Sequence, residues 1–157
     1  MIEQGNSLPE ATLSQLTADG MQQHQVSELF AGKKVVLFAV PGAFTPTCSE
    51  AHLPGYVVLA DQIKAKGVDL IACVAVNDAF VMKAWGETQN ASELMMLADG
   101  DGSFTKALGL EMDTATFGGI RSQRYAMIIE NGVVTTLNVE EGKSFEASKA
   151  ETILALL

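Results

Sequence analysis

Hydrophobic residues are gathered into short runs along the chain, separated by longer stretches in which apolar and polar residues mix. The runs at 33–40 (KKVVLFAV) and 68–76 (VDLIACVAV) are rich in β-branched side chains, which is typical of strands buried on both faces. The mixed stretches at 46–66 and 78–89 that follow them predict helices. This order of strand, helix, strand and helix predicts parallel strands joined by right-handed crossovers.

The later apolar segments favour an antiparallel end to the sheet. Residues 124–140 predict a hairpin, because Asn131-Gly132 near the middle is the commonest pair of a type I′ turn. A parallel βαβ unit followed by a hairpin and a final helix resembles the layout of the thioredoxin fold, an α/β fold with a central mixed sheet flanked by helices. Further strands are expected at 11–16 and 93–99, and short helices at 27–30, 103–109 and 148–157.

Composition narrows the class of protein. A chain of 157 residues can bury one core, and we expect residues 1–157 to form a single domain. The net charge of -9 would repel phosphate backbones and anionic lipid, which argues against nucleic acid as a partner. No apolar run approaches the ~20 residues that span a bilayer and no secretion signal is present, so we expect a cytoplasmic protein without a membrane segment.

The cysteines limit the chemistry further. Only Cys48 and Cys73 occur, too few for a disulfide framework. They do not form a CxxC pair, which excludes a disulfide oxidoreductase of the thioredoxin type. Two separated cysteines and two histidines do not make a zinc site, and no metal or cofactor is expected. The remaining question is the chemistry of a single thiol.

Cys48 lies in an unusual stretch, PGAFTPTCSEAHLPG, directly after the first buried strand. Thr45 followed by Pro46 is typical of a helix start, with the threonine as N-cap and the proline at the first helical position. Cys48 is then the third helical residue, where free N–H groups and the helix dipole stabilise a thiolate. The alternative is a lone cysteine that is only a small buried hydrophobic residue, and position alone does not decide between the two.

Prolines frame this stretch. Pro41 ends the strand and, lacking an N–H group, can form one wall of a pocket. Pro54 removes a backbone hydrogen bond and Gly55 loosens the next step, so the helix is expected to break after about two turns. Such a short segment unfolds locally at modest cost, which would let a buried cysteine come out to meet a reductant.

The pattern PxxxTxxC, formed by Pro41, Thr45 and Cys48, resembles the active-site signature of the peroxiredoxins, thiol peroxidases on a thioredoxin fold. The chain looks most like the peroxiredoxin-five-like branch, because four blocks resemble those of the branch in its order. They are VPGAFTPTCSEAHLPG, VAVNDAFVMKAWG, LADGDGSFTKALGL and RSQRYAMIIENGVV. The resemblance extends from about Phe30 onward.

The resemblance implies a mechanism and a set of catalytic residues. The Cys48 thiolate would attack the terminal oxygen of hydrogen peroxide or an organic hydroperoxide and become a sulfenic acid. Thr45, the backbone N–H groups near Cys48 and an arginine just before the first hairpin strand would stabilise charge on the leaving oxygen. Arg124 matches that arginine, with Arg121 as the second choice, and Pro41 completes the set.

Further residues are candidates for the substrate pocket, and they are Gly42, Phe44, Thr47, His52 and Leu53. His52 lies one helical turn after Cys48, yet a helix N-terminus and an arginine make a histidine base unnecessary. We therefore expect His52 to have a structural or pocket-lining role. For Phe44 and Leu53, plain core packing is an equally good explanation.

The second cysteine does not complete a two-cysteine cycle. Cys73 lies inside the 68–76 run, where a small core residue is expected. Some members of the branch carry a second reactive cysteine near the C-terminus, but 138–151 (NVEEGKSFEASKAE) contains none. This departure predicts a one-cysteine cycle recycled by glutathione with glutaredoxin or, as the second choice, by thioredoxin. The family also implies a homodimer packed near the active-site loops.

A function of another class would use the same thiol. A redox sensor or chaperone-like interaction protein would use the Cys48 sulfenic acid to mark or bind partners. Turnover separates the two, because a peroxidase cycles many times with a thiol reductant whereas a sensor only switches.

Overall fold

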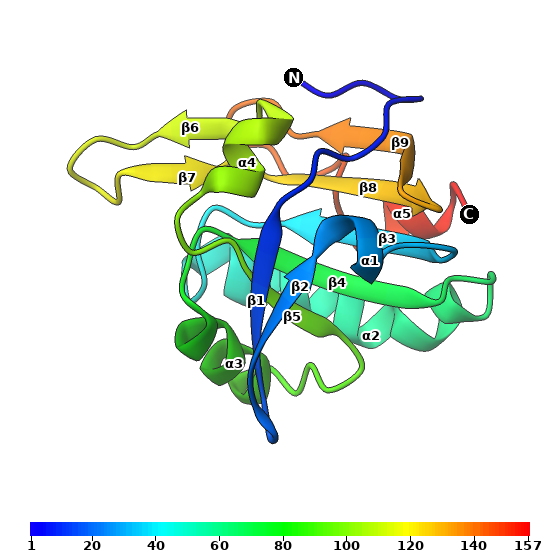
Figure 1. The fold of residues 1–157 in the computed structure, drawn as a ribbon, viewed down its shortest axis with the longest axis horizontal. Helices are drawn as coiled ribbons and strands as arrows, with labels where there is room; N and C mark the ends of the chain where they lie inside the picture. The colour runs from blue at the N-terminus through cyan, green and yellow to red at the C-terminus, as the bar shows by residue number, and fades with distance from the viewer.

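The computed structural model describes residues 1–157, which form a seven-stranded sheet with helices on both faces and a small two-stranded sheet beside it (Figure 1). The strands are β1 (Thr12–Thr17), β2 (Gly20–Gln25), β3 (Lys34–Ala39), β4 (Leu70–Ala75), β5 (Met95–Ala98), β6 (Glu111–Asp113), β7 (Ile120–Ser122), β8 (Tyr125–Glu130) and β9 (Val133–Val139). The helices are α1 (Val26–Leu29), α2 (Leu53–Lys64), α3 (Ala79–Thr88), α4 (Ser103–Leu108) and α5 (Ala150–Leu154), and a π-helical turn, η1 (Cys48–His52), leads into α2.

The main sheet is mixed, as the sequence predicts. Its strand order is β2-β1-β5-β4-β3-β8-β9. The central strands β3, β4 and β5 run parallel, and β8 and β9 extend the sheet antiparallel on one side while β1 and β2 do so on the other. Parallel strands need a crossover of a dozen or more residues, which η1 with α2 and then α3 provide.

Strand β3 shows why an uninterrupted apolar run forms the centre of such a sheet. Successive side chains of a strand point to opposite faces, so both faces of β3 must be covered. Val36, Phe38 and Val40 pack into the hydrophobic core on one face. Val35, Leu37 and Ala39 pack into the core on the other face.

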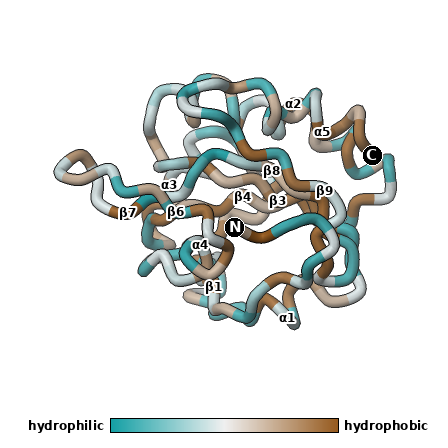
Figure 2. The backbone as a smooth tube through the Cα atoms, turned by 90° about the horizontal axis from the view of Figure 1, so that it is seen from above, coloured by the Kyte–Doolittle hydropathy of each residue, from teal (hydrophilic) through white to brown (hydrophobic).

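Helices close these two cores. Buried residues of α2, α3 and α5 fill the first core, and residues of α1 and α4 fill the second, so the sheet is sandwiched between two helical layers (Figure 1). Viewed from above, the hydrophobic colours run through the middle of the molecule, where β3 and β4 lie between the layers (Figure 2). The carboxyl ends of the parallel strands meet at one edge, and the stretch after β3 starts there.

Two parts of the fold are absent from the sequence prediction. Strand β2 has the sequence GMQQHQ, and because it is an exposed edge strand, it carries no apolar pattern that would mark it as a strand. The β6–β7 hairpin consists of three-residue strands that pair only with each other. The final helix also begins at Ala150 instead of 148, because Lys149 is still extended.

The predicted hairpin is confirmed. Strands β8 and β9 pair antiparallel, and the turn residues Asn131 and Gly132 have φ angles of 50° and 80°. Positive φ at both central positions is the requirement of a type I′ turn.

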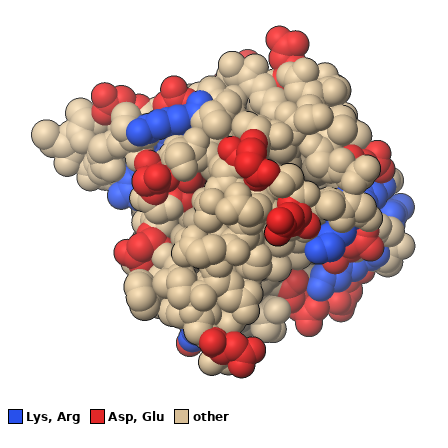
Figure 3. Space-filling model, in the orientation of Figure 1, with Lys and Arg blue, Asp and Glu red and all other residues tan.

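The surface carries the negative charge that the composition implies. On the face shown in Figure 3, acidic side chains are spread singly over the molecule, and most basic side chains stand beside acidic ones at one edge. None of the helices is both long and apolar enough to cross a bilayer.

We expect two buried tyrosines to differ in what their hydroxyl groups contribute. Tyr56 donates to the Ser148 carbonyl at 2.8 Å, whereas the buried hydroxyl of Tyr125 has no hydrogen-bond partner in the protein. Tyr56→Phe should lower the free energy of unfolding by about 1 kcal/mol, and Tyr125→Phe should leave it unchanged or raise it. Urea denaturation of both variants measures this, and an equal loss in both would contradict the assignment.

Candidate active site

The stretch that follows β3 is held against the end of β4. Val40 N–H still donates to Val74 O at 3.2 Å, and Ala43 N–H donates to the Asn77 side chain at 3.0 Å. Between these contacts and the helix, Phe44 adopts a φ of 64°. This left-handed conformation is strained for a residue with a Cβ, and such strain is typical of functional loops.

The helix begins at Pro46, as predicted, and Cys48 is its third residue. The next turn is wider than an α-helix, because Leu53 N–H donates to Cys48 O five residues back. The expected break at Pro54 is wrong, since the chain continues through Pro54 into α2 without interruption. A proline ring clashes with the carbonyl four residues before it, and the wider π-helical turn at that place makes room for it.

Thr45 does not cap the helix with its side chain. Its hydroxyl donates to Gly42 O at 2.7 Å, while its carbonyl accepts from Ser49 N–H at 2.9 Å. The first-turn N–H groups of Thr47 and Cys48 therefore donate to no other protein group. These two N–H groups are free to bind an anion or an oxygen atom beside the sulfur.

Arg124 lies against the sulfur. Its Nη2 donates to Cys48 Sγ at 3.0 Å. The register of the sheet explains this contact, because β8 pairs with β3 so that Tyr125 lies opposite Ala39 at the end where the active-site stretch starts. Ala126 packs into the core that also contains Cys48, and Arg124, two residues before it, points to the same face.

His52 holds Arg124 from the other side. Arg124 Nη1 donates to His52 Nδ1 at 2.8 Å, so this nitrogen must be an unprotonated acceptor. The proton is then on Nε2, which donates to Ser148 O at 3.2 Å. Burial and the charge of Arg124 lower the pKa of His52 to about 3, so the ring is neutral at physiological pH.

A cavity of about 500 Å³ opens beside this group. It is lined by Pro41, Thr47, Met112, Gln123, Arg124, Glu140, Gly142, Lys143 and Ser144. Pro41 and Thr47 thus lie where a pocket wall was expected. The side chain of Cys48 is itself fully buried and is not part of the lining.

Four other candidates lie away from the cavity. Leu53 and His52 are fully buried, and Leu53 belongs to the hydrophobic core. Phe44 is 54% exposed and packs at a tilt over Trp85, with ring centroids 6.4 Å apart. Gly42 has a spatial role, because a Cβ there would lie 3.1 Å from Arg121 Nη1.

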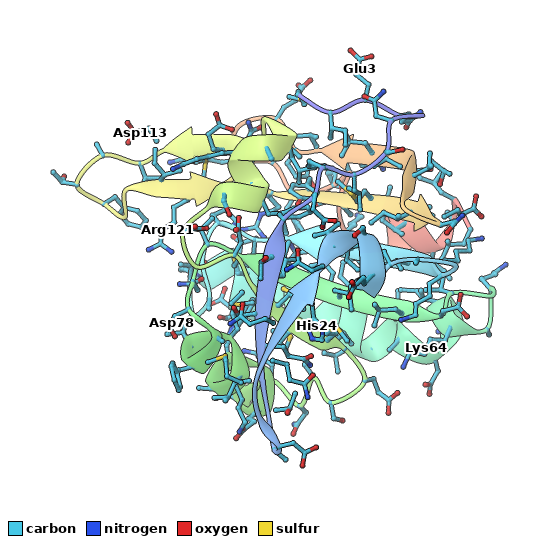
Figure 4. All side chains as sticks on the ribbon, viewed as in Figure 1. Glu3, His24, Lys64, Asp78, Asp113 and Arg121 are labelled. Carbon is cyan, nitrogen blue, oxygen red and sulfur yellow. The ribbon has the colours of Figure 1, made fainter.

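Arg121 fixes the β6–β7 hairpin and does not contact the thiol. Its guanidinium donates to Gly118 O at 3.1 Å and to Val76 O at 3.4 Å. Figure 4 shows it below the hairpin, at the same end of the molecule as Asp78. Arg124, the first choice, is therefore the arginine at the sulfur.

Cys73 is a core residue, in agreement with the sequence. It is fully buried in β4, and both cysteines are free thiols. Burial, followed by the nearby Cys48, raises the pKa of Cys73 well above its ordinary value. Burial therefore favours the protonated form of Cys73.

Some contacts around the site carry no clear signal in the sequence. Trp85 Nε1 in α3 donates to Ser49 Oγ at 2.9 Å, which ties the π-helical turn to the neighbouring helix. Glu140, at the end of β9, binds the segment that contains Ser148. The partners are 36 and 8 residues apart in the chain, so only the folded molecule shows the pairing.

Comparison with known proteins identifies the class. Residues 3–154 match the Redoxin family model. Peroxiredoxin-2C of Oryza sativa subsp. japonica is 53% identical over 156 residues, 98% of this chain and 96% of that protein. The crystal structure of reduced Prx3 from Vibrio vulnificus in complex with H2O2 is 82% identical, covers 99% of both chains and has a TM-score of 0.98. Peroxiredoxin 5 from Alvinella pompejana is 36% identical over 99% of this chain and 97% of its own, with a TM-score of 0.86.

A thioredoxin-like α/β fold with a cysteine at the helix after β3 defines the class as thiol peroxidases. The chain belongs to the peroxiredoxin family, in its type II, peroxiredoxin-five-like branch, and it is an enzyme that reduces peroxides through Cys48.

The neutral His52 predicts a specific dependence of stability on pH. Its folded pKa of about 3 lies below its ordinary value of 6.5, so the unfolded chain takes up the proton first as the pH falls. The stability contributed by neutral His52 is complete above about pH 6.5 and should fall by about 2 kcal/mol at pH 5, at roughly 1.36 kcal/mol per pH unit.

Urea denaturation at pH 7, 6 and 5 measures this slope. His52→Gln should remove the slope between pH 6.5 and 5, whereas His24→Gln, which changes the other histidine, should keep it. An unchanged slope in His52→Gln would show that His52 is not the titrating group.

Proposed function

We propose that Cys48, Arg124, Thr45 and Pro41 carry out the peroxide reduction. The observation that supports this most is the 3.0 Å contact between Arg124 Nη2 and Cys48 Sγ. A lone pair of the thiolate attacks the terminal oxygen of the hydroperoxide, an S–O bond forms and the O–O bond breaks. The leaving oxygen takes the bonding electron pair and is protonated to water or an alcohol, while the sulfur becomes a sulfenic acid.

Charge on the leaving oxygen is the main barrier to this step, and the surrounding groups suit its stabilisation. The guanidinium of Arg124 and the free N–H groups of Thr47 and Cys48 are donors that need no rearrangement before the O–O bond stretches. The Thr45 hydroxyl already donates to Gly42 O, so its lone pairs are left to accept the peroxide O–H. Pro41 forms one wall of the cavity and offers no competing donor.

No side chain at the site serves as a base for the thiol in this proposal. The Nδ1 lone pair of His52 already accepts a hydrogen bond from Arg124. The pKa of His52, about 3, also makes the ring a poor proton acceptor. Arg124 instead places a positive charge 3.0 Å from the sulfur that attacks the peroxide.

The oxidised enzyme is recycled by an external thiol. Cys73 is buried in β4, and no cysteine occurs between Cys73 and the C-terminus. A thiol such as glutathione would attack the sulfenic acid, releasing water and forming a mixed disulfide, and a second thiol from glutaredoxin would release Cys48. Thioredoxin is the second choice, and either reductant fits a reducing compartment such as the cytoplasm.

Exposed aromatic side chains favour a homodimer near the active-site loops. Phe44, Phe80 and Phe117 are all exposed, and they lie after β3, after β4 and in the β6–β7 hairpin. These segments meet at one end of the molecule (Figure 1). Exposed large apolar side chains gathered at one end are typical of a protein interface.

Substitutions at the thiol and the arginine test the mechanism. Cys48→Ser should abolish the fast reaction with hydrogen peroxide in stopped flow, and Arg124→Met should slow it by about 100- to 1000-fold, because a preorganised donor is lost. Arg121→Met is the matched control, since it removes an arginine that holds the hairpin but does not contact the sulfur, and it should stay within about tenfold of the unchanged protein.

Turnover completes this test. Sustained peroxide consumption with glutathione and glutaredoxin is the expected result. Consumption with thioredoxin but not with glutathione and glutaredoxin would show that thioredoxin is the reductant. A single oxidation of Cys48 without turnover by either system would favour the redox sensor instead. A rate in Arg124→Met equal to that of the unchanged protein would contradict the proposed role of the arginine.

The dimer is tested at its most exposed aromatic residue. Phe117 is 84% exposed, and Phe117→Glu should convert a dimer into a monomer in size-exclusion chromatography with light scattering, because a charge cannot be buried in an apolar contact without a partner. Val58→Glu changes another highly exposed apolar residue, 77% exposed on α2, and should leave the dimer intact. A monomeric unchanged protein would refute the interface.

A further inference from the structure

Glu140 is a buried carboxylate that the mechanism does not yet use. It is the residue after β9 and is 7% exposed. Its oxygens accept from five groups of the following segment. These are the N–H groups of Glu146 at 3.0 Å, Ala147 at 3.2 Å and Ser148 at 2.7 Å, and the hydroxyls of Ser148 at 2.6 Å and Ser144 at 3.3 Å. We call this arrangement of Glu140 around residues 146–148 the carboxylate cradle.

The charge of Glu140 is part of this arrangement. Burial raises the pKa of Glu140, but the hydrogen bonds from Ser148, Glu146 and Ala147 outweigh it and leave the pKa below its ordinary value. The side chain is therefore an ionised carboxylate at neutral pH, and a carboxylate accepts several hydrogen bonds without offering a donor. Glu140 makes no salt bridge, so its charge is balanced by backbone N–H groups.

The cradle fixes the carbonyl group of Ser148. That oxygen accepts from two buried side chains of the active-site helix, Tyr56 at 2.8 Å and His52 Nε2 at 3.2 Å. With the N–H group and the hydroxyl of Ser148 both held by Glu140, the carbonyl has little freedom to turn away. The residue therefore joins the segment after β9 to the helix that carries Cys48.

The carbonyl in turn decides which nitrogen of His52 carries the proton. A carbonyl oxygen is only an acceptor, so Nε2 must be protonated and Nδ1 must offer its lone pair to Arg124. A carboxylate at the position of the His52 ring would orient Arg124 equally well but would neutralise the charge of the guanidinium. A neutral histidine orients the guanidinium and leaves its full positive charge for the sulfur.

We propose that Glu140 is a positioning residue for peroxide reduction, acting through the Ser148 carbonyl and neutral His52 to aim Arg124 at Cys48. This inference rests on the proposed roles of Cys48 and Arg124. Glu140 makes no hydrogen bond to the sulfur, and its effect is on the direction of the guanidinium. When the cradle is lost, the Ser148 carbonyl can turn, and the His52 ring that donates to it is no longer fixed. Arg124 Nη1 then loses the acceptor that holds it.

Glu140→Gln is the test variant, because the amide keeps the shape of the side chain but loses its charge. The amide NH2 would also face the N–H groups of residues 146–148, which are donors themselves. Glu146→Gln is the matched control, since Glu146 lies in the same segment but its exposed side chain pairs only with Lys149. The reaction of Glu140→Gln with hydrogen peroxide should slow by about tenfold or more, whereas its alkylation by iodoacetamide, which has no peroxide oxygen to stabilise, should change less than about threefold. Glu146→Gln should match the unchanged protein in both reactions.

The protonation of His52 is a readout that a purely structural role would not move. Nitrogen-15 NMR of histidine distinguishes the two neutral tautomers, and a His24→Gln background leaves His52 as the only signal, because the chain has two histidines. The unchanged protein should show proton on Nε2 and a bare Nδ1 from pH 5 to pH 8, and Glu140→Gln should show a mixture of tautomers. Ser148→Ala, which removes only one of the five contacts to Glu140, should give a smaller effect in the same direction.

The outcomes separate this inference from the proposed function. If Arg124→Met is slow but Glu140→Gln keeps both the peroxide rate and the Nε2–H tautomer, the cradle has no positioning role and the catalytic proposal stands. If Arg124→Met is as fast as the unchanged protein, the catalytic proposal itself fails. Should Glu140→Gln not fold, a protonated Nδ1 in the unchanged protein would still overturn the inference, because that nitrogen could not accept from Arg124.

Discussion

The antiparallel pairing of β8 with β3 is the constraint on which the site depends. It sets Tyr125 opposite Ala39 and so brings Arg124 to the end of the sheet where the cysteine helix begins. Because side chains alternate along a strand, a slip of one residue in this register would turn the arginine to the other face, away from the thiol. The hydrophobic residues of β3 and β8 that fill both cores therefore also fix the direction of the charged side chain of Arg124.

The polar groups behind the thiol form one connected series of hydrogen bonds. Each member hydrogen-bonds the next, in the order Glu140, Ser148, His52 and Arg124, and the series ends at the sulfur of Cys48. Buried polar groups are tolerated when each has a partner, and a series of such groups holds its members in fixed directions. The charge of Arg124 is not cancelled along this path, since its partner is a neutral ring.

The active-site helix is held by side-chain contacts with other parts of the chain, and it contains a π-helical turn near its start. The π-helical turn from Cys48 to His52 accommodates Pro54, and its own side chains are held by Trp85, Arg124 and Ser148. These contacts come from three different parts of the chain. The proposed recycling by an external thiol requires that the buried Cys48 become accessible. Side-chain contacts of this kind can be broken without unfolding the sheet.

The sequence by itself determined the elements whose cause is local. The apolar runs of β3 and β4, the Asn131-Gly132 turn and the helix start at Pro46 follow from burial and backbone preferences of neighbouring residues, and the motif around Cys48 indicated the chemistry. The exposed edge strand β2 left no such mark, and Pro54 was taken as a helix breaker because a π-helical turn has no simple signature in sequence. Only the tertiary structure decided that Arg124 and not Arg121 meets the sulfur, that Thr45 donates to Gly42 instead of capping the helix, and that His52 is neutral. The reason is physical: these outcomes depend on the register of distant strands and on burial, which exist only once the chain has folded.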